Sequence, residues 1–267
     1  MGITHFCFGL SYLTALGMDL LQIFQPAHWK RLVSIFFGVA GLLAHTIFLA
    51  MHQPSPASPY GSLLLLGWVF AVFYTYGNLH QKPYPWTLFV LPLVLLFVAL
   101  SLAFLHERNA DVEFWFSGEH FWGKVHGTLI LLASVGITLG FLASVMYLVQ
   151  DHRLRRKKSP FGGFKLLSLE RLETINRRAI NLAFPLLSVG LLLGVMRLQR
   201  DELQPTSWTE PKVLGTLGLW AVGVLLLYLR YGAHLPGRRL AWLTIASFIL
   251  LLVALVTSHP FAHGGSR

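Results

Sequence analysis

Three histidines stand where an imidazole could bind haem iron or carry a proton. His45 lies well inside an apolar segment (GLLAHTIFL), His126 opens another (KVHGTL), and His259 closes a third (TSHPF). A neutral imidazole is a common haem ligand and also titrates near physiological pH. Taken singly, each histidine is explained equally well as an amphipathic side chain at the end of a membrane span. Their spacing alone does not bring them together.

A tryptophan in a polar connection adds a second candidate. Trp208 lies in the run DELQPTSWTEPK at 201–212, between two apolar segments. Tryptophan at a membrane surface usually belongs to the aromatic belt. An indole beside histidines can instead contact the flat face of a porphyrin. Both interpretations of Trp208 stay open.

Other reactive groups are scarce in the apolar segments. Asp19 is an ionisable residue inside the first of them, and a carboxyl in a span is a functional candidate by default. Its place near the expected cytoplasmic end favours an interfacial carboxylate. The single cysteine, Cys7, excludes an intrachain disulfide and a paired-cysteine redox motif.

The elements that must position these side chains are membrane helices. The 267 residues are 55% hydrophobic and 12% charged, with a mean hydropathy of +0.61, whereas a soluble domain carries about 25% charged residues. Apolar blocks of about 20 residues match the thickness of a bilayer. We therefore expect an all-α integral membrane protein, a bundle of about eight transmembrane helices forming a single polytopic domain over 1–267. The expected spans are 3–24, 32–51, 60–79, 86–105, 126–149, 179–198, 213–230 and 239–257.

The distribution of basic residues gives an orientation. With both termini on the non-cytoplasmic side, 15 of the 21 Lys and Arg fall in cytoplasmic connections, nine of them in a basic loop at 150–178. This is the bias of the positive-inside rule. The formal net charge of +10 is thereby explained by topology, with anionic lipid as a further partner of the loop and no need for a nucleic-acid partner.

Four sequence runs together resemble the cytochrome c assembly domain of CcsA/ResC-type proteins. They occur in the family's order and extend the resemblance over about residues 32–260. One opens on a helix histidine followed by a proline-containing loop, one begins at the histidine of KVHGTL, one contains AFPLLSVG, and one begins WTEPK. The runs are 41–65, 125–150, 169–194 and 208–220.

The resemblance implies a set of haem-binding residues. His126 and His259 match the two external histidines that ligate haem b, with His263 competing for the second position in the run SHPFAH. Trp208 is what remains of the family's tryptophan-rich loop. His45 matches the first of two membrane-embedded histidines.

Two departures from the family pattern accompany these matches. Arg230 stands in the run YLR where the second embedded histidine falls, and an arginine could pair a haem propionate. The incomplete tryptophan motif resembles the HemX-like branch of the family.

The expected function is haem handling and presentation at the outer face of a bacterial cytoplasmic membrane during c-type cytochrome maturation. The resemblance implies apocytochrome c and a CcsB/ResB-like protein as partners. It favours an assembly factor, or a subunit of a cytochrome c haem lyase, over a stand-alone enzyme. The alternative is a HemX-like regulator or scaffold of haem biosynthesis that carries no haem. A small-solute transporter is a third reading, disfavoured because no inverted repeat is visible.

Overall fold

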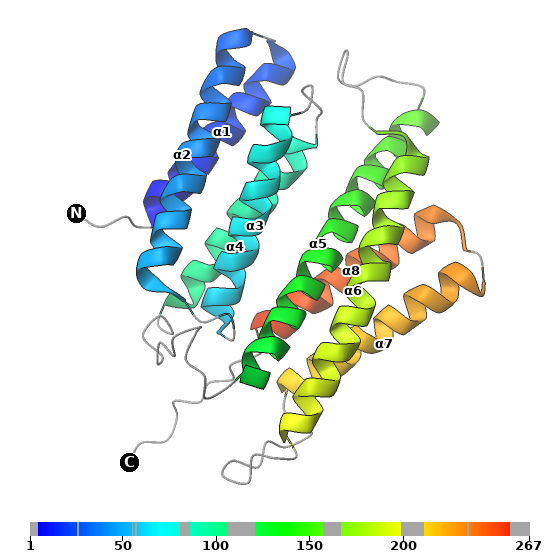
Figure 1. Cartoon of the computed structure of the whole chain (residues 1–267). Helices are drawn as coiled ribbons and strands as arrows, with labels where there is room; N and C mark the ends of the chain where they lie inside the picture. The colour runs from blue at the N-terminus through cyan, green and yellow to red at the C-terminus, as the bar shows by residue number, and fades with distance from the viewer. Residues whose placement is uncertain are drawn as a thin grey trace. The chain divides into compact units, whose positions relative to one another are not determined.

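The computed structural model of the chain is entirely helical over the residues that it describes (Figure 1). These are residues 5–25, 27–54, 56, 58–80, 86–105, 121–156, 167–198, 211–233 and 235–256. They contain eight α-helices and no strand, which confirms the expected all-α class. The helices are α1 (His5–Phe24), α2 (His28–His52), α3 (Pro59–His80), α4 (Thr87–Ala103), α5 (Phe121–Arg155), α6 (Leu169–Leu198), α7 (Pro211–Tyr231) and α8 (Gly237–Val256).

Seven of these helices are long and apolar enough to cross a membrane. The eighth, α4, has 17 residues, or about 26 Å at the rise of an α-helix, slightly less than the roughly 30 Å of hydrocarbon. An α-helix satisfies its own backbone hydrogen bonds, which is what lipid requires. The chain is therefore a multi-pass membrane protein, and its orientation stays a prediction.

The helices extend beyond the expected spans on either side of the basic loop. α5 continues to Arg155 and α6 begins at Leu169, so much of the expected loop at 150–178 is helical. Ser168 caps the start of α6, because its Oγ accepts a hydrogen bond from the backbone N–H of Arg171 at 3.3 Å. Arg, Lys and Glu are good helix formers in water, and hydropathy does not detect a helix once it leaves the apolar layer.

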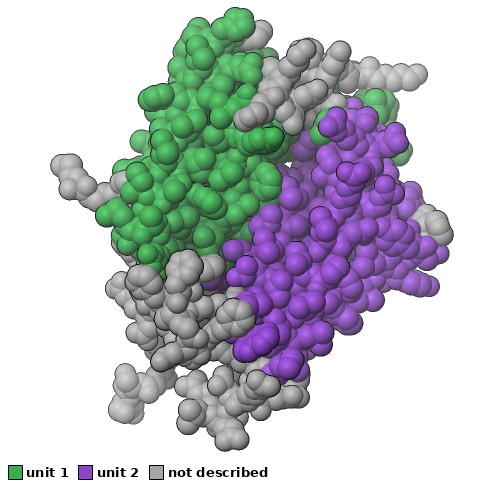
Figure 2. All heavy atoms as spheres, viewed as in Figure 1, with its two compact units in different colours: residues 1–55, 60–112, 153–167 green, residues 56–59, 113–152, 168–267 purple. Residues whose placement is uncertain are grey.

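The helices group into two compact units (Figure 2). Unit 1 comprises residues 1–55, 60–112 and 153–167 and contains α1 to α4. Unit 2 comprises residues 56–59, 113–152 and 168–267 and contains most of α5 together with α6, α7 and α8. That the two units work as one membrane domain remains a prediction.

In unit 1, α1 packs against α2 and α4. The buried residues of α1 are separated alternately by three and four positions, the spacing of a helix-packing seam. They are His5, Phe8, Tyr12, Ala15 and Asp19. On α2, Gly41 lets the Tyr12 ring approach, because a Cβ there would lie 2.8 Å from the ring carbon Cε1. Gly38 receives the ring of Tyr74 from α3 in the same way.

In unit 2, small residues bring helix backbones close together. A Cβ at Gly136 of α5 would lie 2.8 Å from the Cβ of Ala183 on α6. Small residues at such crossings are typical of membrane helix pairs, where close van der Waals packing drives association. α7 packs against both α6 and α8, and this arrangement positions the polar groups described next.

Candidate functional site

His126 is held by a backbone contact between α5 and α6. Its Nδ1 lies 2.6 Å from the carbonyl oxygen of Gly190, and its ring lies over Gly194, where a Cβ would be 2.9 Å from Cε1. The two glycines are one helical turn apart and leave room for the imidazole. Because a carbonyl oxygen can only accept, Nδ1 carries the proton, and Nε2 is the basic nitrogen of the neutral ring. Metal-ligating histidines are commonly oriented in this way.

His45 is fully buried in unit 1. Its ring stacks on Phe8 of α1, with centroids 4.3 Å apart and planes 2° from parallel. Its Nδ1 lies 3.4 Å from the hydroxyl of Tyr12. Its Nε2 is buried and, within the described part of the chain, has no hydrogen-bond partner. A buried polar atom without a partner is costly, and this unpartnered imidazole nitrogen is available to a ligand that reaches it.

Two further histidines, His5 and His52, both contact Phe48, whose ring centroid lies 5.6 Å from that of Phe8. The ring centroid of His5 is 4.5 Å from that of Phe48, and its Nε2 is 2.7 Å from the Tyr60 hydroxyl. His52 stacks on the same Phe48 ring, with the two ring centroids 4.2 Å apart. The residues predicted from the sequence to form the site included neither of these histidines.

Arg230 lies in the last turn of α7, where the helix dipole favours a cation. Its Nη2 donates a hydrogen bond to Oδ1 of Asn176 on α6. Its Nε and Nη1 are buried and have no hydrogen-bond partner among the described residues. A guanidinium whose N–H groups have no partner can donate two hydrogen bonds to one anionic group in a bidentate geometry.

Asn176 connects Arg230 to the other helices of unit 2. Its amide nitrogen lies 3.0 Å from the Gly140 carbonyl oxygen and 2.7 Å from Ser144 Oγ, both on α5. The same nitrogen lies 3.1 Å from Thr244 Oγ1 on α8. One buried amide therefore joins four helices, and no sequence motif indicated it.

His126 and Arg230 lie at different levels of unit 2. Arg230 donates a hydrogen bond to Asn176, and Asn176 donates one to the Gly140 carbonyl oxygen on α5. His126 lies 14 residues before Gly140 on the same helix, which is about 21 Å at about 1.5 Å per residue. The structure therefore does not bring these two predicted residues to one point. His45 belongs to unit 1. Trp208, His259 and His263 lie outside the described residues, so their roles remain predictions.

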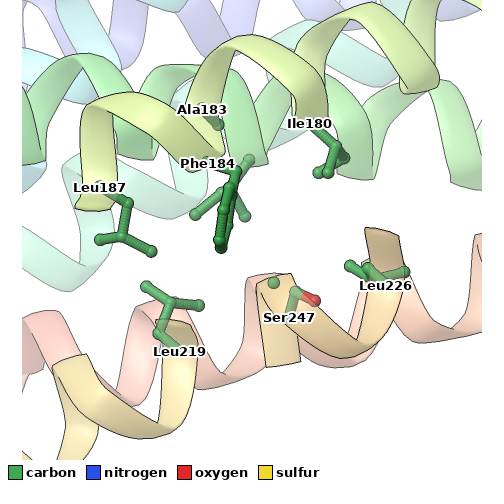
Figure 3. Close-up of a pocket in the computed structure, with 9 residues that line it drawn as sticks. Ile180, Ala183, Phe184, Leu187, Leu219, Leu226 and Ser247 are labelled. Atoms are coloured by element: carbon green, nitrogen blue, oxygen red, sulfur yellow. The ribbon is translucent and has the colours of Figure 1, made fainter. Parts of the chain in front are cut away.

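A small cavity in unit 2 is not a haem pocket. Figure 3 shows Phe184 and Leu187 of α6 facing Leu219 of α7 and Ser247 of α8 across it. It encloses about 20 Å³, space for one water molecule. The Ser247 hydroxyl already donates to the Leu243 carbonyl at 2.9 Å. The described residues also contain no group of three or more His, Cys, Asp or Glu placed to hold a metal ion.

A polar cluster in unit 1 escaped the sequence analysis. Asp19 of α1 is buried against Ser34 of α2 and Tyr74 of α3. The available signal was the seven-residue spacing of His5, Tyr12 and Asp19, which places three polar residues on the seam of one helix. Asp19 is thus buried inside the helix bundle of unit 1, where the sequence favoured an interfacial carboxylate.

Comparison with known proteins places this fold in a family. The chain is 22% identical to the cytochrome c biogenesis protein CcsA of Guillardia theta, over 94% of this chain and 91% of that protein. It is 25% identical to CcsA of Prochlorococcus marinus subsp. pastoris, over 96% of this chain and 88% of that protein. It is 31% identical to the protein HemX of Bacillus subtilis over 132 residues, which span 48% of this chain and 46% of HemX. No solved structure matches the chain.

The match to a family model is more extensive than the HemX alignment. The model described as cytochrome C assembly protein matches residues 56–261, which is more than half of the chain and includes all of α5 to α8. The resemblance seen in the four sequence runs is thereby confirmed, including its HemX-like component. The chain belongs to the cytochrome c assembly protein family and has a role in cytochrome c biogenesis.

Proposed function

We propose that the protein holds haem b at the outer face of a bacterial cytoplasmic membrane and presents it for attachment to apocytochrome c. The observation that carries this proposal is the contact between His126 Nδ1 and the Gly190 carbonyl. This contact fixes the tautomer in which Nε2 bears the lone pair that iron requires. His259, with His263 as its competitor, would be the second axial ligand.

The residues present suit haem in their chemistry. The two glycines at 190 and 194 orient the His126 ring without side chains of their own. Bound haem would supply the vinyl groups with which cytochrome thiols form thioether bonds. Those thiols would be the apocytochrome's own, because Cys7 has no second cysteine in this chain. Trp208 would contact the face of the porphyrin.

His45 and Arg230, which lie inside helices, would contact haem at other depths in the membrane. His45 offers the unpartnered Nε2, but Phe8 and Tyr12 enclose the ring, so these side chains must move before iron can bind there. Arg230 offers Nε and Nη1 to a propionate while Nη2 stays on Asn176. Arginine cannot ligate iron, so its role would be to bind the carboxylate and position the ring.

The partners follow from this role. The protein would act with apocytochrome c and with a CcsB/ResB-like protein that supplies an extracytoplasmic domain. The basic segment around the α5–α6 connection would hold anionic lipid at about 1 kcal/mol per residue near the surface. Five of its described arginines are exposed, namely Arg155, Arg156, Arg171, Arg177 and Arg178.

Absorption spectroscopy of the detergent-purified full chain tests the proposal. We expect a haem Soret band in the wild-type protein and its loss in the double variant H126A/H259A. The matched control is H152A, because His152 is an exposed histidine on the same helix. Absence of haem from every preparation would exclude the proposal, as would an unchanged spectrum in the double variant.

A regulatory role is the second candidate, favoured by the 31% identity with HemX over half of the chain. In that case the protein would scaffold or regulate haem biosynthesis without carrying haem. Capture of a haem-synthesis enzyme, together with normal cytochrome c levels in a deletion strain, would select it.

A further inference from the structure

Asp19 is surrounded by hydroxyl groups from three other helices. The Ser34 hydroxyl of α2 lies 2.5 Å from Oδ1, and the Tyr74 hydroxyl of α3 lies 3.3 Å from Oδ2. The two hydroxyls are themselves 2.8 Å apart. The Thr87 hydroxyl at the start of α4 lies near the same carboxyl. Asp19 is only 8% exposed, so unit 1 buries nearly all of it.

Among the described residues, no basic side chain forms an ion pair with this carboxyl. On α2, Arg31 and Lys30 lie three and four residues before Ser34. Among the described residues, Arg31 Nη2 donates to the Asn78 carbonyl oxygen at 3.5 Å, and the Lys30 ammonium donates to Gln25. The contacts are 3.1 Å to the Gln25 carbonyl oxygen and 3.2 Å to Oε1. Asp19 contacts only hydroxyl groups in the part of the chain that the structure describes. An ionised carboxylate without a partner in a membrane span is costly.

Counting protons shows which form of Asp19 fits the geometry. Asp19, Ser34 and Tyr74 form a ring of three contacts. If Asp19 is ionised, the ring holds only the two hydroxyl protons, and one contact sets two oxygens together without a hydrogen between them. If Asp19 is protonated, it donates to Tyr74, Tyr74 donates to Ser34, and Ser34 donates to the other carboxyl oxygen. The protonated form therefore satisfies all three contacts.

A metal cation does not fit the same oxygens. Neighbouring ligand oxygens around a small cation such as Mg²⁺, bound at 2.0–2.1 Å in an octahedron, are about 2.9 Å apart, and they are farther apart around larger cations. The Ser34–Asp19 and Ser34–Tyr74 separations are 2.5 and 2.8 Å. These are hydrogen-bond distances, so the ligand that the cluster takes is a proton.

We propose that Asp19 is a proton-binding site inside the membrane-spanning bundle, holding one proton at neutral pH in a closed ring with Ser34 and Tyr74. The site is independent of haem binding and uses none of the residues assigned to haem. Carboxyls that bind and release protons within a span are the groups from which membrane proton relays are built. Besides Tyr74 itself, the described titratable or charged groups within four residues of the ring along the chain are Lys30 and Arg31 on α2 and Tyr76 on α3.

Infrared spectroscopy of the full chain in detergent or liposomes tests the site. A protonated carboxyl has a C=O stretching band that a carboxylate lacks. At about pH 7, where an exposed Asp or Glu is ionised, we expect such a band in the wild-type protein and its complete loss in D19N. The amide of D19N can present one donor and one acceptor to the ring, so we expect the fold to be retained. The control E170Q, at an exposed carboxyl of α6, should leave the band unchanged.

A second variant keeps the test decisive if D19N fails to fold. Y74F removes one hydroxyl of the ring and leaves Asp19 in place, and we expect it to shift the frequency of the band. Absence of the band from the wild-type protein at about pH 7 would overturn the proposal. So would a band that D19N leaves in place, or one that Y74F does not move.

Discussion

Replacing Asn176 by leucine removes the polar junction of unit 2 and keeps the number and branching of the side-chain heavy atoms. The amide nitrogen has two protons for its three acceptors, Gly140 O, Ser144 Oγ and Thr244 Oγ1. Its carbonyl oxygen accepts from Arg230. At most three interhelical hydrogen bonds are therefore lost at once, and the guanidinium loses the partner that it has in this unit.

The magnitude follows from these contacts. An interhelical hydrogen bond in a membrane protein contributes about 0.6 kcal/mol on average and about 1.7 kcal/mol at most, so three bonds amount to about 2–5 kcal/mol. The two hydroxyls keep their own acceptors, since Ser144 donates to Gly140 O and Thr244 donates to Leu240 O. Arg230 has no second hydrogen-bond acceptor among the described residues. We expect N176L to lower the free energy of unfolding by about 2–4 kcal/mol.

Equilibrium unfolding in mixed detergent micelles, followed by circular dichroism, measures this difference. The matched control is N181L, because Asn181 lies on the same helix but is exposed and bonded to Tyr231. We expect this control to change stability by less than about 1 kcal/mol. Equal effects of N176L and N181L would refute the assignment of Asn176 as a junction.

A double-mutant cycle separates the charge from the amide. R230M removes the cation together with its need for a partner, so adding it to N176L should cost less than the sum of the two single changes by about 0.5–3 kcal/mol. Strict additivity would show that Arg230 gains nothing from Asn176. The same R230M protein, assayed for haem, reports whether the guanidinium also binds a propionate.

Two glycine substitutions, with a third as a control, test one close approach in each unit. G41A places a Cβ 2.8 Å from the Tyr12 ring and should destabilise unit 1 by about 1–3 kcal/mol. In the control G17A the new Cβ has nothing within 4 Å, so this variant should stabilise α1 by about 0.5–1 kcal/mol. Equal melting temperatures of the two variants would contradict the packing argument. G194A places a Cβ 2.9 Å from His126 Cε1 and should displace the imidazole, lowering the haem content at an unchanged helical content. Full haem occupancy in G194A would show that the ring position is not needed.

Part of the candidate site was visible in the sequence because it depends on local order. His126 is noticeable because it opens an apolar segment, and His45 because it interrupts one. The seven-residue spacing of His5, Tyr12 and Asp19 was also present, and it marks a helix seam without showing what faces it. The partners of these residues come from other helices, at separations of 64 residues for His126 and Gly190 and 55 residues for Asp19 and Tyr74.

The sequence by itself determined the class of protein, the number of its helices and its family. Hydrophobic length and charge are properties of contiguous residues, and lipid leaves a long apolar segment little alternative to a helix. Only the tertiary structure decided which nitrogen of His126 carries the proton, which amide receives Arg230, and that the Asp19 carboxyl is enclosed by hydroxyls. Each of these depends on the rotation and depth of one helix against another. That arrangement is set by side-chain packing at glycines such as Gly38, Gly41 and Gly194, and no periodicity along the chain encodes it.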